Sequence, residues 1–225
     1  MANWSRMPVA KLIEAATTLY TNARDTPEIV AELVEFGYER DPGPDETTGD
    51  FDDGLALVAA VTRERTEFAA EEADEDEAVA SAAAAAGALR ARFVQDRKRA
   101  RRAYDPGTEG HAALRLAGTT PRSRAPLAAA ADDFYGTIAS RPDLIEPIRG
   151  LTRERAVEGA ALVTAYRTAA TTLARESGEV DVAADELREA VSALRTHAAQ
   201  LAGDAADALA DTPQLREVLG LLQRS

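Results

Sequence analysis

The chain has 225 residues, of which 39 are acidic and 26 basic, so its formal net charge is -13, and it contains no cysteine. The lack of cysteine excludes disulfides, thiolate zinc sites, iron–sulfur clusters and cysteine nucleophiles. Aromatic residues make up only 5% of the chain while alanine is abundant, which favours closely packed helices over a strand-rich sandwich. The composition therefore predicts an all-α protein of one large domain or two small ones.

The chain is strongly acidic, and its only lysines are Lys11 and Lys98. Such a surface is typical of proteins adapted to a salt-rich, halophilic cytoplasm, where carboxylates stay hydrated and their repulsion is screened. A GC-rich genome, which favours arginine and alanine codons, is the alternative explanation.

The first residues lack the continuous apolar core of a secretory signal. The most apolar stretch, 78–89, is far shorter than the roughly 20 apolar residues of a membrane span. We therefore expect a cytoplasmic protein without a membrane contact.

Apolar residues recur at helical spacing in the longer segments, for example at Leu127, Ala131, Phe134 and Ile138. Between these segments lie stretches rich in turn-forming residues, which predict loops. The pattern predicts a helix, a short hook helix and two long helices, then the same order again and a last short helix. The expected helices cover residues 8–25, 27–37, 51–73, 76–104, 124–140, 142–150, 153–176, 180–210 and 212–223.

The same segment occurs twice in the chain. Tyr20 and Pro27 match Tyr135 and Pro142, which lie 115 residues later, and similar apolar residues follow at equal spacing. A second block, which begins at Asp53 in the first copy and at Glu158 in the second, matches over a separation of 105 residues. The difference in separation indicates an insertion in the first copy, and the acidic, turn-rich segment 41–50 has the composition expected of one.

The hook is repeated a third time, in part, at 211–223. Thr212 and Pro213 repeat Thr26 and Pro27. A threonine before a proline is typical of an N-cap followed by the first helical residue, where the missing N–H of proline costs nothing. Each hook is therefore expected to end one helix and start a short one.

Together these patterns predict two tandem, internally duplicated four-helix units with short hook helices. The first unit is expected at 1–106 and the second at 122–225, with the long helices of each copy forming an antiparallel hairpin. The segment between them, 107–121, reads either as a flexible linker or as a turn that lets the units share one core, and its composition favours the linker.

Several short motifs of the second copy and of the chain end resemble uncharacterised bacterial helical-bundle proteins. The resemblance implies a helical bundle and no assigned activity. The first copy departs from it through the insertion at 41–50 and a basic helix end. The motifs are Phe134-Tyr135, Arg141-Pro142-Asp143-Leu144-Ile145, Gly150-Leu151-Thr152, Gly159-Ala160-Ala161-Leu162-Val163, Pro213-Gln214-Leu215 and Leu219-Gly220-Leu221.

The clearest candidate binding site is the basic helix end at 90–102, in which Asp96 is the only acid. Arginine contacts phosphate bidentately, so this end is a candidate site for nucleic acid or another polyanion. The alternative is internal: cations complement the negative end of a helix dipole, and a hairpin would place them beside the acids at 41–53. The sequence favours this neutralisation. The candidate residues are Arg90, Arg92, Arg97, Lys98, Arg99, Arg101 and Arg102.

Other clusters point to no chemistry. The acidic run at 67–77 is expected to form the solvated tip of the first hairpin, since it lacks the ligand spacing of an EF-hand. With only His111 and His197, the chain cannot supply the Glu-x-x-His pairs of a di-iron centre, and His197 reads as an ordinary helix-face residue. No motif of the common enzyme classes occurs. We therefore expect no catalytic residue, no cofactor and no metal site.

The sequence is best explained by a non-enzymatic interaction or scaffold protein that binds a protein partner or a second copy of itself. One alternative is nucleic-acid or polyanion binding through residues 90–102. Another is a small-molecule carrier with a cavity beside Tyr20 and Tyr135, although packing is the more usual role of such tyrosines.

Overall fold

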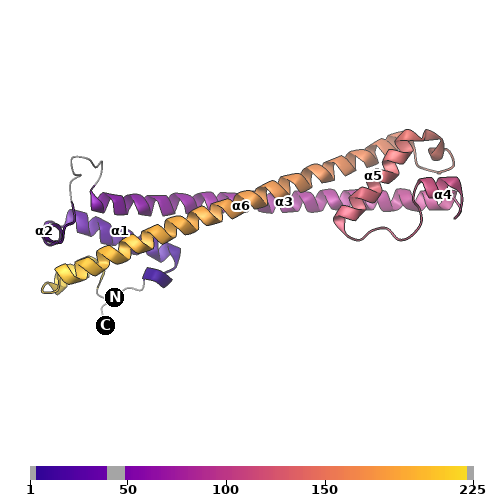
Figure 1. The fold of residues 1–225 in the computed structure, drawn as a ribbon. Coiled ribbons are helices and arrows are strands. Elements are labelled where there is room, and N and C mark those ends of the chain that lie inside the picture. The colour runs from indigo at the N-terminus through magenta and orange to yellow at the C-terminus, as the bar shows by residue number, and fades with distance from the viewer. Residues whose placement is uncertain (1–3, 40–48, 222–225) are drawn as a thin grey trace. The chain divides into compact units, whose positions relative to one another are not determined.

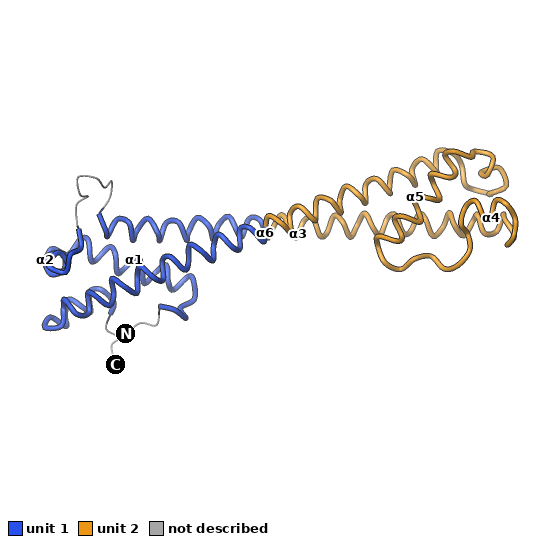
Figure 2. The backbone as a smooth tube through the Cα atoms, in the orientation of Figure 1, with its two compact units in different colours: residues 1–71, 180–225 blue, residues 72–179 orange. Residues whose placement is uncertain are grey.

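A computed structural model of the chain describes residues 4–39 and 49–221 (Figure 1). All regular structure in these residues is helical, which confirms the all-α prediction. The chain divides into two compact units: unit 1 contains residues 1–71 and 180–225, and unit 2 contains residues 72–179. The long helices α3 (Asp50–Ala103) and α6 (Arg153–Ala208) each contribute to both units (Figure 2). In the described part of the chain, none of the helices combines the length and apolar character that crossing a bilayer requires.

Unit 1 packs the first part of α3 and the last part of α6 against shorter elements. Its core combines Leu12, Leu33, Val61 and Leu194, each of which is fully buried. These side chains come from four different helices, so a single core holds the unit together. The shorter elements are η1 (Trp4–Arg6), α1 (Val9–Asp25), α2 (Pro27–Glu35) and α7 (Pro213–Val218).

Unit 2 is built in the same way from the last part of α3 and the first part of α6. The rings of Phe93 on α3 and Phe134 on α5 meet edge to face, with centroids 5.7 Å apart. Leu116 and Ile148, from the segments before and after α5, complete the core. The shorter elements of this unit are α4 (Glu109–Ala113), α5 (Arg124–Ser140) and η2 (Pro142–Ile145).

Both long helices continue through the places where the sequence predicted breaks, near 74 and near 178. Residues 55–86 contain neither glycine nor proline, and alanine and glutamate are strong helix formers. Gly178 does not break α6, because one glycine costs only about 1 kcal/mol in a helix. Ser177 donates a hydrogen bond of 2.6 Å to Glu75 across the two helices instead of capping a new one. The predicted hairpins, and with them the four-helix copies, are therefore replaced by single long helices.

The structure divides the chain differently from the boundaries at 1–106 and 122–225. Each long helix belongs to both units, so a division by sequence position separates residues that share a core. The segment 107–121, expected to be a linker, carries α4 and buries Leu114 and Leu116 in the core of unit 2. The acidic run at 67–77 lies inside α3 and is not the tip of a hairpin.

The hooks follow the predicted pattern in part. Pro27 and Pro213 are the first residues of α2 and α7, after Thr26 and Thr212 at the N-cap positions. Neither threonine side chain makes a capping hydrogen bond. The second hook is shorter than the expected 142–150 helix, since only a 3-10 helix forms before the chain turns. Of the insertion at 41–50, residues 41–48 lie outside the described residues.

The burial pattern of α3 recurs along α6. Residues of α3 that are buried have a buried or half-buried counterpart on α6 at a separation of 105 residues, the separation seen between the sequence blocks. Each long helix is preceded by a short helix and a hook. The buried pairs include Phe51 and Ala156, Val58 and Val163, Leu89 and Leu194, Phe93 and Ala198, and Ala100 and Ala205.

Two arginines that lie 105 residues apart, Arg90 and Arg195, make the same kind of hydrogen bond to a backbone carbonyl. Arg90 donates a hydrogen bond of 3.2 Å to the carbonyl of Arg122, just before α5. Arg195 donates one of 2.8 Å to the carbonyl of Met7, just before α1. The acceptors are themselves 115 residues apart, the separation of the matched tyrosines. Each long helix therefore ties down the start of a short helix in its unit through an arginine at the same position.

Candidate functional site

The basic helix end at 90–102 lies on α3 in unit 2, and its central residue, Arg97, is buried with 5% of its surface exposed. The Arg97 guanidinium donates hydrogen bonds of 2.7 Å to the carbonyl of Ala117 and 3.1 Å to the hydroxyl of Thr120. Burial, and secondarily the charge of Arg101, lowers the pKa of Arg97. The side chain holds the segment before α5 against α3, and it is not available to an external anion. Its further acceptors are the carbonyls of Arg115, Leu116 and Gly118.

Arg101 and Arg90 bind the same segment from α3. Arg101 donates a hydrogen bond of 2.9 Å from Nε to the carbonyl of Leu116, and a further one to the carbonyl of Gly118. Arg90 reaches the carbonyl of Pro121 at 3.3 Å. Backbone carbonyls outside regular helices need hydrogen-bond donors, and arginine supplies several N–H donors in one plane. Three of the candidate arginines are therefore structural.

Asp96 is the acceptor for a second group of cations. It is fully buried, and its carboxylate accepts hydrogen bonds from Arg99 at 2.9 Å, Arg155 at 2.7 Å and Tyr135 at 3.1 Å. The carboxylate therefore has partners on α3, α5 and α6, as a buried charge requires. Arg92, from the candidate set, forms a separate ion pair of 2.5 Å with Glu158 on α6.

The expected neutralisation by the acids at 41–53 does not occur for the described acids. Asp50, Asp52 and Asp53 begin α3 in unit 1, whereas the basic residues end the same helix in unit 2. Asp52 pairs with Arg24 of α1 at 3.1 Å. The expectation depended on a hairpin inside the first copy, which the continuous helix replaces. Asp41, Asp45 and Glu46 lie outside the described residues.

Four of the candidate cations are exposed: Arg90 and Arg101, which donate to backbone carbonyls, and Lys98 and Arg102. Arg102, Arg99 and Arg149 border a cavity of about 280 Å³ at the end of α3, whose other lining residues are Ala103 and Pro147. Arg149 lies in the turns that follow η2 and is exposed. Arg149 was not among the predicted site residues, because only the fold brings the second hook beside the end of α3.

The matched tyrosines occupy matched packing positions. Tyr20 and Tyr135 are both fully buried, and burial raises the pKa of each above the ordinary tyrosine value. A methyl group added at Gly54 would lie 2.2 Å from the Tyr20 ring, and one added at Gly159 would lie 2.2 Å from the Tyr135 ring. The glycines thus let the short helices approach the long ones closely.

The tyrosine hydroxyls have different partners. The Tyr20 hydroxyl lies 2.7 Å from Nδ1 of His197, within hydrogen-bond distance, whereas the Tyr135 hydroxyl bonds to Asp96. His197 is therefore more than the ordinary helix-face residue that its sequence neighbours predicted. His111 donates its backbone N–H to Thr108 at the start of α4, which is a capping contact.

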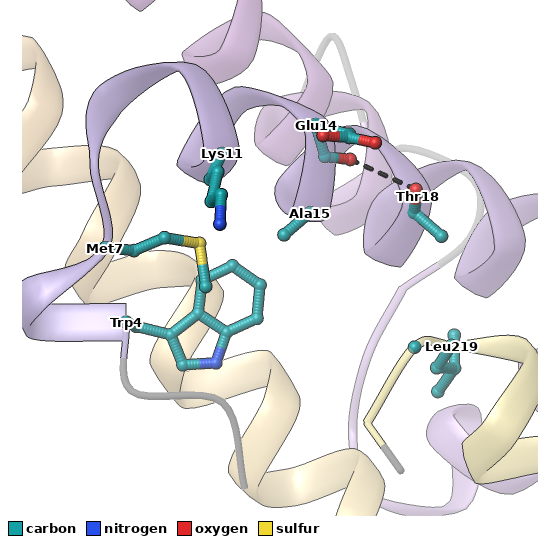
Figure 3. A pocket seen from close by; sticks show the side chains of 8 residues that line it. Trp4, Met7, Lys11, Glu14, Ala15, Thr18 and Leu219 are labelled. Carbon is teal, nitrogen blue, oxygen red and sulfur yellow. Dashed lines mark hydrogen bonds between the residues drawn. The ribbon is translucent and has the colours of Figure 1, made fainter. Parts of the chain in front are cut away.

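Two cavities border residues relevant to a carrier function. Tyr135 lines one of about 180 Å³ in unit 2, together with Ile138, Pro142 and Ile145. The other, of about 310 Å³, lies in unit 1, where Trp4, Met7 and Lys11 face the same space (Figure 3). Leu219, from the end of the chain, also lines this second cavity, so sequence position gave no indication that these residues meet.

Comparisons of the chain with protein-family models, with curated proteins and with solved structures found no match. The resemblance of the hook motifs to uncharacterised bacterial helical-bundle proteins therefore stays a prediction.

Proposed function

We propose that this chain is a non-enzymatic helical protein that acts by binding another protein. The main support comes from the use of its buried charges. In the described residues these are Asp96, Arg97 and Glu176, and each has partners within the chain. Asp96 and Arg97 hold helices and backbone in place, and Glu176 pairs with Arg175. Groups committed in this way are unsuited to proton transfer or nucleophilic attack, which require a side chain free to react with a substrate.

The surface that best fits a protein partner is the end of α2. Val34 and Phe36 are 48% and 54% exposed there. Glu32 and Glu35 lie beside them and are also exposed. Leu151, which lies 115 residues after Phe36, is only 3% exposed in unit 2, so the second hook lacks this exposure. An apolar pair among carboxylates is complementary to a partner segment that carries an apolar anchor flanked by lysine or arginine.

A capture experiment tests this surface. Tagged wild-type protein, Phe36→Ser and Val157→Ser are incubated with lysate of the source organism at native salt, with and without nuclease. Val157 is 63% exposed on α6 and provides a control for losing an apolar surface residue. We expect a nuclease-resistant partner that Phe36→Ser loses and Val157→Ser retains. Equal capture by all three proteins would contradict a role for α2.

Self-association is separated from binding to another protein by light scattering during gel filtration. A wild-type mass that is twice that of Phe36→Ser would identify the partner as a second copy of the chain. Monomeric masses for both proteins, together with a captured partner that carries a basic apolar segment, would support the proposal as stated.

The cavity beside Trp4 supports a second candidate function, the binding of a small apolar molecule. Trp4 is the only tryptophan of the chain, so its fluorescence reports on this cavity alone. Titration with a polarity-sensitive naphthalene sulfonate dye should change the Trp4 emission, and Ala15→Phe, which fills the cavity, should abolish the change. An emission that the dye leaves unchanged would count against a carrier function in unit 1.

We further propose that the chain arose by duplication of a short helix, a hook and one long helix. The burial pattern shared by α3 and α6 supports this repeat, and so do the equivalent contacts of Arg90 and Arg195. The repeat provides matched positions in the two units. Residues that are alike at a matched position serve the packing of both units, whereas residues that differ there belong to one unit.

A further inference from the structure

We propose that the cavity between Arg99, Arg102 and Arg149 in unit 2 binds a compact, multiply charged oxyanion of the phosphate or pyrophosphate class. The cavity, of about 280 Å³, is large enough for such a group, and its lining contains three guanidinium side chains and no carboxylate. Guanidinium groups form charge-assisted, often bidentate hydrogen bonds with phosphate oxygens. This site is independent of the protein-binding surface proposed on α2.

Arg99 is held in place at this cavity from within the protein. Its Nη1 group donates to buried Asp96 at 2.9 Å, and that carboxylate also accepts from Arg155 and Tyr135. A guanidinium has five N–H donors, so the bond to Asp96 leaves others for a ligand. The arrangement orients Arg99 before an anion arrives, which reduces the entropy lost on binding.

Arg102 and Arg149 bring two charges that no carboxylate of the described residues neutralises. Neither takes part in an ion pair among the described residues, although acids outnumber basic residues by 39 to 26 in the sequence. Arg92, Arg115, Arg141, Arg155 and Arg167 of the same unit all have carboxylate partners. Like charges that converge on one cavity repel each other, and a bound anion removes this repulsion.

The equivalent positions of unit 1 are acidic or apolar, whereas those of unit 2 are basic. At the separation of 105 residues, Asp204 and Asp207 on α6 correspond to Arg99 and Arg102 on α3. At the separation of 115 residues, Val34 corresponds to Arg149. Packing residues such as Ala100 and Ala205 are alike in the two units. Arg102 and Arg149 are therefore not required by the packing of this helix end, because the other unit packs without a cation at either position.

The ligand is a compact anion and not a nucleic-acid strand. A strand needs a row of cations along its backbone. Arg90, Arg97 and Arg101, which would extend the row along α3, donate to carbonyls of the segment before α5. Among the arginines at 90–102, Arg102 keeps its guanidinium free in the described structure, and Arg99 uses one N–H group for Asp96.

Isothermal titration calorimetry of the full chain with sodium pyrophosphate, at ionic strength fixed by sodium chloride, tests the proposal. We compare wild type with Arg102→Gln, Arg149→Gln and the double variant. Lys98→Gln is the matched control, because it removes an exposed cation from the same helix end outside the cavity. Each arginine variant should weaken pyrophosphate binding about tenfold or more. The double variant should show no measurable binding, and Lys98→Gln should stay within a factor of about two.

Arg149→Lys provides a second variant that retains the charge. It should bind pyrophosphate with an affinity between those of wild type and Arg149→Gln, since lysine keeps the charge but loses the bidentate geometry. Thermal unfolding followed by circular dichroism should show the same Tm for all variants, because the changed side chains are exposed.

Absence of binding heat for wild type, or equal weakening by Lys98→Gln, would overturn the proposal. A short single-stranded oligonucleotide serves as the competing source of phosphate groups. Weaker binding of the oligonucleotide than of pyrophosphate supports the compact site. Oligonucleotide binding that pyrophosphate cannot displace, and that the two arginine variants retain, would overturn it.

Discussion

The ring of Tyr135 lies directly over Gly159, so close that a Cβ at position 159 would be 2.2 Å from the ring carbon Cζ. This contact brings α5 against α6 and places the Tyr135 hydroxyl 3.1 Å from Asp96 on α3. One tyrosine thus links three helices of unit 2, and a side chain as small as glycine on α6 is the condition for it. Tyr20 and Gly54 have the same relationship in unit 1.

Replacing Gly159 should therefore destabilise the protein. In Gly159→Ala the new methyl group overlaps a ring that is fully buried, and we expect a loss of about 1 to 3 kcal/mol in the free energy of unfolding. Gly178→Ala is the matched control, because nothing lies within 4 Å of the Cβ that it adds to the same helix. It should be neutral or more stable by up to about 1 kcal/mol. Urea unfolding measures both, and equal stabilisation by the two changes would refute the contact.

Asp96→Ala should be the more costly of two aspartate substitutions. It leaves Arg99, Arg155 and the Tyr135 hydroxyl without their buried acceptor, and loss of one partner in a buried ion pair costs about 3 to 5 kcal/mol. Asp132 pairs with Arg167, where both side chains are half exposed, so Asp132→Ala should cost less than about 1 kcal/mol. Thermal or urea unfolding distinguishes the two, and comparable losses would count against a structural role for Asp96.

The continuity of α3 predicts the effect of a proline at Asp74, which lies inside the helix. Asp74→Pro removes an intrahelical hydrogen bond and clashes with the preceding turn, which costs about 3 kcal/mol. Asp74→Ala provides the control and should be neutral or slightly stabilising, since alanine favours helix. Far-ultraviolet circular dichroism during urea unfolding measures both variants. Tolerance of the proline would indicate a turn at this position.

Burial of the tyrosines predicts a loss of stability in alkali. Burial, with a further contribution from Asp96, raises the pKa of Tyr135 above its ordinary value of 10.0 in the folded state. The unfolded chain therefore loses this proton first as the pH rises through 10, and the free energy of unfolding falls by about 1.4 kcal/mol per pH unit for each such tyrosine.

Tyr135→Phe removes one of these groups. Its free energy of unfolding should differ from that of wild type by a constant amount between pH 7 and 9, where neither state ionises. Above pH 10 it should fall less steeply than that of wild type. Parallel curves across pH 10 to 12 would show that Tyr135 ionises equally well in the folded chain.

The helical class and the hooks are properties that the sequence indicates by itself. Alanine and the spacing of apolar residues act over a few turns, and Pro27 and Pro213 start helices because of their own geometry. The match between Tyr20 and Tyr135 also identified two positions that the structure buries in equivalent contacts. The helices and hooks depend on residues that are close in the chain, and the tyrosine match is a comparison of sequence alone, so neither requires knowledge of the fold.

The path of the long helices and the partners of the arginines were decided only by the tertiary structure. Gly178 and the acidic run near Asp74 weaken a helix by small local amounts, and packing along the whole of α3 and α6 outweighs them. The sequence likewise shows that Arg97, Arg99 and Arg102 are near one another, but not that one binds carbonyls, one a buried carboxylate and one only solvent. That difference depends on which distant groups each side chain meets, and those contacts exist only when the chain is folded.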